Sequence, residues 1–113
     1  MKQHQLGNYI VFDSEHLTKK IIYSGDQVLV FVLNFIQGQK LPRHGHEGGT
    51  LTLLVNEGSG TIAIDEEQSI YKAGDLFILE GDETLELPSI TSKTTLLVTI
   101  SPNPSNPIYR QPR

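Results

Sequence analysis

The strongest constraint on the fold is a regular succession of short apolar runs separated by glycine, aspartate, asparagine or proline. Runs rich in Ile, Val, Leu, Thr and aromatic residues, bounded by such turn residues, are typical of β-strands. The predicted strands cover residues 8–12, 19–23, 27–36, 50–55, 61–64, 69–71, 76–79, 84–87 and 94–100. Turns are predicted at 24–26, 57–60, 65–67, 73–75 and 81–82. This spacing predicts an all-β protein arranged as a barrel or a sandwich.

The apolar periodicity indicates which strand faces are buried. Apolar residues recur at every second position in several strands, as at Leu85 and Leu87, so one face of each should lie against the core. Residues 28–33 are apolar at every position. Such a run suits a strand between the core and another surface, such as a neighbouring subunit. Helical periodicity is weak, and only residues 14–20 indicate a helical turn, with a serine at the capping position.

Length, charge and cysteine content exclude several functions. The 113 residues fit a single globular domain. Nine basic against 13 acidic residues give a net charge of -4, which lacks the positive field that nucleic-acid binding requires. Without cysteine there is no disulfide, thiolate nucleophile or cysteine-ligated metal. No apolar run approaches the ~20 residues of a membrane helix, and no apolar stretch follows the first residues, so we expect a cytoplasmic protein without a membrane partner.

The chain ends in a proline-rich segment. Four of its six prolines lie within residues 102–113, among Asn, Ser and Gln. We expect one domain over residues 1–101, followed by this extended tail. The tail is either a disordered end or an arm that packs on a partner, for which Ile108 and Tyr109 supply apolar surface.

His44 and His46 are the first candidates for chemistry. Residues two apart on a strand point to the same face, so both imidazoles could converge on one ligand or metal ion. The alternative is that the His-Gly-His segment, between Pro42 and a pair of glycines, is only a polar turn. Spacing alone leaves both interpretations open.

The surrounding residues resemble the first sequence motif of the cupin family. That motif has a glycine, five residues, His-X-His, three or four residues, a glutamate, six residues and a glycine. Here Gly38 opens it, His44 and His46 supply the histidines, Leu51 stands in the glutamate place and Gly58 closes it.

The second cupin motif is matched only at its start. Gly74 opens it, followed by Asp75 and the apolar residues 76–78. Where the family has a proline, a glycine, a histidine and an asparagine, this chain has Glu80, Asp82, Leu85 and Ser89. Sliding the motif by one residue to use Gly81 puts Thr84 in the histidine place, so neither register restores a metal ligand.

The resemblance implies a small antiparallel jelly-roll barrel with a pocket inside. Metal-binding cupins generally use two histidines and a glutamate from the first motif and a histidine from the second. This chain keeps only His44 and His46, and a catalytic zinc or iron ion needs at least three protein donors. Glu83 lies two residues before Leu85 and would face the same side of a strand, so it is the preferred replacement for the missing metal ligand. Glu47 is the second choice. The metal would be one divalent ion of zinc, nickel, manganese or iron.

Two functions and one structural role follow. By strand parity the pocket wall would comprise His44, His46, Leu51, Leu53, Leu85 and Leu87, although these leucines could simply complete the core. The first hypothesis is a small-molecule-binding or sensing protein without catalysis. The second is a metal-dependent oxygenase, isomerase or lyase that uses His44, His46 and a replacement carboxylate. The two-sided apolar run at 28–33 and the tail also predict a homodimer. No catalytic residue or substrate is assigned.

Overall fold

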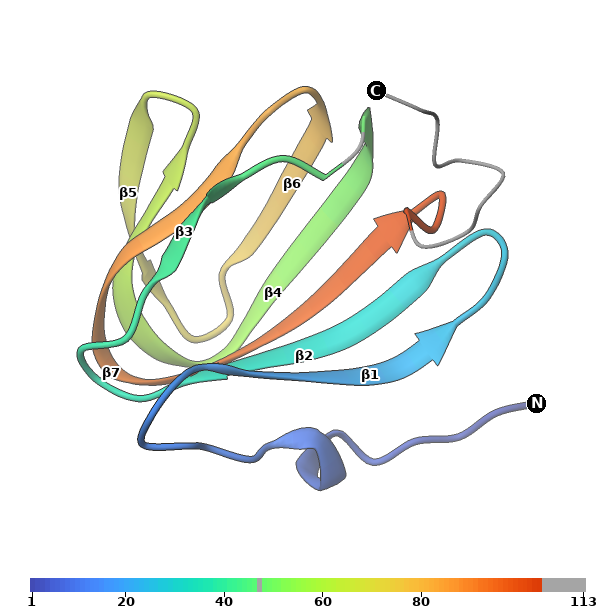
Figure 1. The fold of residues 1–113 in the computed structure, drawn as a ribbon, viewed down its shortest axis with the longest axis horizontal. Coiled ribbons are helices and arrows are strands. Elements are labelled where there is room, and N and C mark those ends of the chain that lie inside the picture. The colour runs from blue at the N-terminus through green and yellow to red at the C-terminus, as the bar shows by residue number, and fades with distance from the viewer. Residues whose placement is uncertain (47, 105–113) are drawn as a thin grey trace.

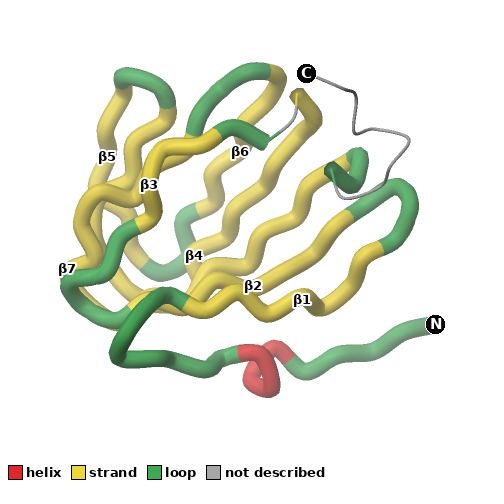
Figure 2. Tube along the Cα trace, in the orientation of Figure 1, coloured by secondary structure: helices red, strands yellow, loops and turns green. Residues whose placement is uncertain are grey.

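The computed structural model describes residues 1–46 and 48–104 and contains seven strands within them. The elements are η1 (Leu6–Tyr9), β1 (Thr18–Ser24), β2 (Leu29–Phe35), β3 (Leu41–His44), β4 (Gly48–Ile64), β5 (Glu67–Lys72), β6 (Leu76–Gly81) and β7 (Leu85–Ser101). All strand pairs are antiparallel, and the sheet folds over on itself (Figure 1). The single turn of 3-10 helix, η1, is the only helix among the described residues (Figure 2). None of them forms a helix long and apolar enough to cross a membrane.

Two long strands connect the two halves of the barrel. β4 and β7 have 17 residues each and pair along most of their length. The first half of β4 and the second half of β7 form one layer with β6, β2 and β1. The other halves form the second layer with β5 and β3. The layers therefore share a continuous backbone, and the core lies between them.

A close backbone contact allows β4 to bend from one layer into the other. The register between β4 and β7 shifts between Val55 and Ser59. Within this stretch Gly58 has a φ of 111°, a conformation that residues with a side chain rarely adopt. A Cβ at Gly58 would lie 2.5 Å from the Cα of Thr94. Only glycine fits both the backbone angle and the space, so this bend depends on Gly58.

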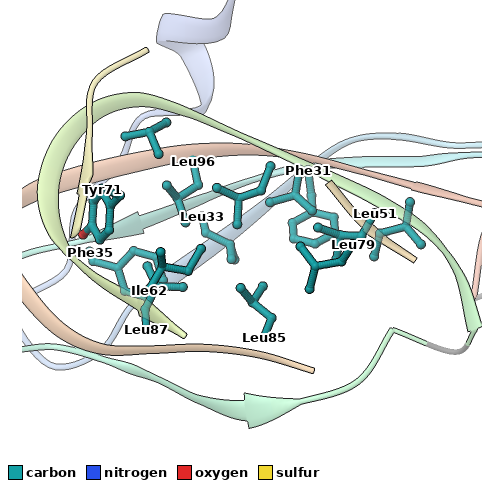
Figure 3. Close-up of a cluster of buried hydrophobic side chains, with 14 of the residues drawn as sticks. Phe31, Leu33, Phe35, Leu51, Ile62, Tyr71, Leu79, Leu85, Leu87 and Leu96 are labelled. Carbon is teal, nitrogen blue, oxygen red and sulfur yellow. The ribbon is translucent and has the colours of Figure 1, made fainter. Parts of the chain in front are cut away.

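The core is filled by inward-facing side chains from both layers (Figure 3). Tyr71 is its largest side chain and is only 1% exposed. The hydroxyl oxygen of Tyr71 lies 2.7 Å from Oγ1 of Thr94, which lies 2.9 Å from the carbonyl oxygen of Ser92. Because that carbonyl can only accept, Thr94 donates to it and Tyr71 donates to Thr94. Burial raises the pKa of Tyr71, since the core disfavours the phenolate.

The N-terminal segment covers the outer face of β2. It runs below β1 in Figure 1, and the buried side chain of Asn34 on β2 donates to the carbonyl oxygen of Tyr9 at 2.9 Å. Val32 points away from the core cluster and is nevertheless fully buried. Both faces of the apolar run at 28–33 are therefore at least partly buried within one chain. The burial of Val32 does not require a neighbouring subunit.

The structure confirms the predicted all-β antiparallel class and corrects several elements. The strand predicted at 8–12 is wrong, because this stretch contains part of η1 and irregular backbone, and the helical turn predicted at 14–20 is wrong because β1 begins at Thr18. The turn predicted at 57–60 is a bend inside β4. The strands predicted at 84–87 and 94–100 are parts of the single strand β7. Of the proline-rich tail, residues 105–113 lie outside the described residues.

Candidate ligand-binding site

An apolar cavity opens on the inner face of the layer that contains β1 and β2. Its volume is about 530 Å³, and it is bordered by β1, β2, β3, β4 and β7. The lining residues are Leu17, Lys19, Leu29, Phe31, Leu33, Leu41, His44, Gly45, His46, Leu51, Leu85, Val98, Ile100 and Pro104. Small-molecule sites typically have volumes of ~300–1,000 Å³, apolar walls and a few polar groups. The cavity has these properties.

His44 is the last residue of β3 and lies at the edge of the cavity. It pairs with Leu85 of β7, which brings the two cupin-like motifs together. Nδ1 of its imidazole lies 2.9 Å from the carbonyl oxygen of Pro42. A carbonyl only accepts, so Nδ1 carries the hydrogen and Nε2 carries the lone pair. The side chain is exposed, which leaves Nε2 able to accept from or coordinate a ligand.

His46 lies beyond the end of β3 and is 5% exposed. Its Nε2 lies 2.7 Å from the carbonyl oxygen of Gly49, so Nε2 carries the hydrogen and donates. Nδ1 then carries the lone pair, and this atom is buried without a hydrogen-bond partner among the residues that the structure describes. Both histidines line the cavity, but they differ in burial because they do not share one strand as the spacing predicted.

Lys19 is a cavity residue that no sequence motif reveals. Among the described residues that line the cavity, it is the only Lys, Arg, Asp or Glu. It pairs with Leu33 across β1 and β2, and its ammonium lies 4.5 Å from the centre of the Phe31 ring. Lys19 begins the strand predicted at 19–23, and its alternation with Ile21 is the one sequence signal that could have placed Lys19 on the inner face.

The predicted leucines divide between the cavity and the core. Leu51 and Leu85, which stand in the family's glutamate and histidine places, both line the cavity and are almost completely buried. Leu53 and Leu87 are fully buried in the core cluster and are not among the described residues that line the cavity. The apolar residues in the two former ligand places therefore form part of the cavity wall.

In the part of the chain that the structure describes, no carboxylate joins His44 and His46 as a third metal ligand. Oε1 of Glu83 accepts a hydrogen bond from the backbone N–H of Glu80 at 2.8 Å, which holds Glu83 in the turn between β6 and β7 and outside the cavity lining. Glu47 lies outside the described residues. Residues 1–46 and 48–104 contain no group of three His, Cys, Asp or Glu side chains that could hold a metal ion.

Within residues 1–46 and 48–104, the donor set therefore does not fit a tightly held metal ion. His46 uses Nε2 as a donor to Gly49, and its remaining lone pair on Nδ1 is buried. Of the two histidines, only His44 presents an accessible lone pair. One accessible donor is fewer than the three protein ligands that fix catalytic zinc sites.

Comparison with known proteins identifies the fold and the family. TT1209 from Thermus thermophilus is similar in structure, with a TM-score of 0.82 over 90% of this chain and 98% of that chain at 20% identity. An RmlC-like cupin from Desulfovibrio desulfuricans has a TM-score of 0.76 over 90% and 97% of the two chains at 24% identity. A double-stranded β-helix protein from Klebsiella pneumoniae has a TM-score of 0.80 over 91% of each chain at 18% identity.

At these identities the structural likeness shows the fold alone. Among curated proteins, none gave a significant match to this chain. The family model described as "Cupin domain" matches residues 31–101, which is more than half of the chain and includes both histidines and both motif leucines. The chain therefore belongs to the cupin family.

Proposed function

We propose that this cupin binds a small, largely apolar organic molecule in its cavity and serves as a binding or sensing protein without catalysis. The observation that carries the proposal is the cavity of about 530 Å³, whose wall consists mainly of Leu, Ile, Val and Phe side chains. Burying an apolar ligand against such a wall contributes roughly 25 cal/mol per Å² of apolar surface removed from water.

The few polar groups would orient the ligand. Nε2 of His44 can accept a hydrogen bond from a ligand at the cavity edge, because Pro42 already engages Nδ1. The hydrogen bond to the carbonyl oxygen of Gly49 fixes the orientation of His46 in the cavity wall. An apolar wall with a small number of placed polar atoms gives both affinity and orientation.

A cavity-filling variant tests this proposal. Leu41 lines the cavity and is half-buried, so Leu41→Trp should occupy space that a ligand needs. Ile70 is exposed on β5, so Ile70→Trp introduces the same side chain away from the cavity. The probe is phenylbutyramide, a neutral molecule with an apolar body, titrated by calorimetry into both variants and the unmodified protein.

We expect saturable one-to-one binding to the unmodified protein and to Ile70→Trp, and loss of binding in Leu41→Trp. Circular dichroism and thermal melting should show that both variants are folded. Equal binding by the two variants would contradict the proposal, and so would an unmodified protein that binds neither phenylbutyramide nor its carboxylate analogue, phenylbutyrate.

Metal analysis tests the alternative of a metal-dependent enzyme. The protein should be purified without a histidine tag, because paired histidines also take up nickel and zinc adventitiously. The proposed function predicts substoichiometric metal. One divalent ion per chain that disappears in His44→Ala would overturn it in favour of the metal enzyme.

A further inference from the structure

We propose that the ligand of this cavity is a monoanion, an apolar carboxylate whose charged group pairs with Lys19. This inference rests on the proposed small-molecule-binding function and specifies the chemical class of the ligand. It starts from the one cationic side chain among the described residues of the cavity wall.

The strand geometry places Lys19 on the cavity side. Lys19 pairs with Leu33, whose side chain belongs to the core cluster, whereas Lys20 pairs with Val32, which points away from that cluster. Successive residues of a strand face opposite sides, so these two lysines lie on opposite faces of β1. Of the two, only Lys19 lines the cavity.

The ammonium of Lys19 is held over the cavity wall without a carboxylate partner among the described residues. It lies 4.5 Å from the centre of the Phe31 ring, and Phe31 also lines the cavity. Neither salt bridge in the described part of the chain involves Lys19. The described lining residues include no Asp or Glu. The positive charge at the cavity is therefore uncompensated by the residues that form its wall.

This charge discriminates between ligands. Lys19 is exposed, so a neutral ligand in the cavity would displace only part of the water around its ammonium and would return no charge-assisted bond. A carboxylate would replace that water with a hydrogen bond to a charged group, which is stronger than a bond between neutral groups. The apolar wall accommodates the remainder of the ligand.

The lining also limits the ligand to one negative charge. Beyond Lys19, the polar side chains among the described lining residues are the two histidines, and the accessible nitrogen of His44 is an acceptor when Nδ1 donates to Pro42. A second carboxylate would face this lone pair or the leucine wall, where it would lack a donor. The cavity therefore favours an apolar monocarboxylate over a dicarboxylate.

Lys19 has a competing structural explanation. β1 is an edge strand, and inward-pointing charges on edge strands discourage edge-to-edge association. This explanation predicts that removing the charge promotes self-association and leaves ligand preference unchanged. The two explanations therefore differ in what they predict for binding.

The test compares two probes of nearly the same shape, phenylbutyrate and its neutral amide, phenylbutyramide, by titration calorimetry at neutral pH. The variants are Lys19→Met, which keeps the apolar stem and removes the charge, Lys19→Arg, which keeps the charge, and the matched control Lys20→Met. Circular dichroism and light scattering accompany each titration to record folding and association.

We expect the unmodified protein to bind the carboxylate at least about tenfold more tightly than the amide, as one charge-assisted hydrogen bond implies. Lys19→Met should abolish this preference, whereas Lys19→Arg and Lys20→Met should keep it. The preference should also shrink as NaCl rises to about 0.3 M, because Lys19 is exposed and ions in solution screen its charge.

The titrations separate a failure of the ligand-class inference from a failure of the proposed function. Equal affinity for the two probes in the unmodified protein, or a carboxylate preference that survives in Lys19→Met, would overturn the inference and leave the proposed function standing. Self-association of Lys19→Met with an unchanged carboxylate preference would assign Lys19 to edge protection. Failure of both probes to bind would overturn the proposed function itself, and the ligand class with it.

Discussion

At the scale of single residues, the bend in β4 depends on the absence of a side chain at Gly58. In Gly58→Ala the Cβ would collide with Thr94 and the positive φ would be strained, so we expect the free energy of unfolding to fall by at least about 2 kcal/mol. Gly38 is the matched control, because it also has a positive φ but a Cβ there meets nothing within 4 Å. Gly38→Ala should cost only about 1 kcal/mol. Equal losses in urea denaturation would contradict the close-contact argument.

The buried phenol of Tyr71 makes a second prediction at this scale. Tyr71→Phe should lower the stability at neutral pH by about 1 kcal/mol, since it removes the bond to Thr94 but leaves Thr94 bonded to Ser92. Because the folded pKa of Tyr71 is raised above its usual value of 10.0, the folded state holds this proton more tightly than the unfolded state. The contribution of Tyr71 is therefore complete below pH 10.0 and is lost as the pH rises further.

Denaturation of both proteins across this alkaline range measures the effect. The stability of the unmodified protein should decline more steeply above pH 10.0 than that of Tyr71→Phe, so the difference between them should shrink. A constant difference would show that Tyr71 titrates alike in the folded and unfolded states.

At the scale of elements, the N-terminal segment is held to the sheet by Asn34. The Asn34 side chain donates to the carbonyl oxygen of Tyr9 and to Oγ1 of Thr18, and it accepts from Oγ1 of Thr95. Asn34→Ala should lower the stability by about 2–3 kcal/mol, because the buried Thr95 and the half-buried Tyr9 and Thr18 all lose a bond. It should also speed proteolysis within the first 17 residues.

Asn56 provides a control on β4, where its side chain is exposed. Asn56→Ala should leave both the stability and the proteolysis pattern unchanged within about 0.5 kcal/mol. Proteolysis of the N-terminal segment at equal rates in the two variants would show that Asn34 does not hold it.

Local patterns predict some elements and misjudge others for physical reasons. The alternation of Leu85 and Leu87 and the turn at 73–75 depend on neighbouring residues, and the structure confirms both. The glycines at 58 and 60 favour a turn by local propensity. In the structure this stretch is a bend within β4 that packs against β7, and the sequence does not reveal that long-range contact. The segment at 8–12 has apolar residues but no strand partner, so its packing comes from tertiary contacts that local propensity does not contain.

The candidate site is predictable only where a motif marks it. His44 and His46 stand in a recognisable spacing, and Leu51 and Leu85 are found by their places in the two motifs. Lys19 carries no motif, and its position on the cavity depends on the pairing of β1 with β2. The hydrogen bond from His46 to Gly49 likewise depends on the loop conformation.

At the scale of the whole molecule, we propose that the protein is a homodimer that associates through β4 and β6. Leu54, Leu76 and Ile78 are exposed on one face of these strands, and Leu54 lies directly opposite Leu76. An isologous interface would bury this face against its own copy. Light scattering at micromolar concentration should give the mass of two chains.

A charge in this face should separate the dimer. Ile78→Glu should give the mass of one chain, because a carboxylate in an apolar interface loses its hydration. Ile70→Glu is the control, since Ile70 lies on β5 and is the more exposed of the two isoleucines. A single-chain mass for the unmodified protein, or dissociation by both variants, would contradict an interface at β4 and β6.

The occupied cavity is best located by methyl NMR during a titration with phenylbutyrate. We expect saturable shifts of the methyl groups of Leu17, Val98 and Ile100, which line the cavity. The methyl groups of Leu54 and Ile78 on the outer face should keep their positions. Shifts confined to the outer face, or none that saturate at the cavity residues, would contradict the claim that this cupin holds a small molecule inside its barrel.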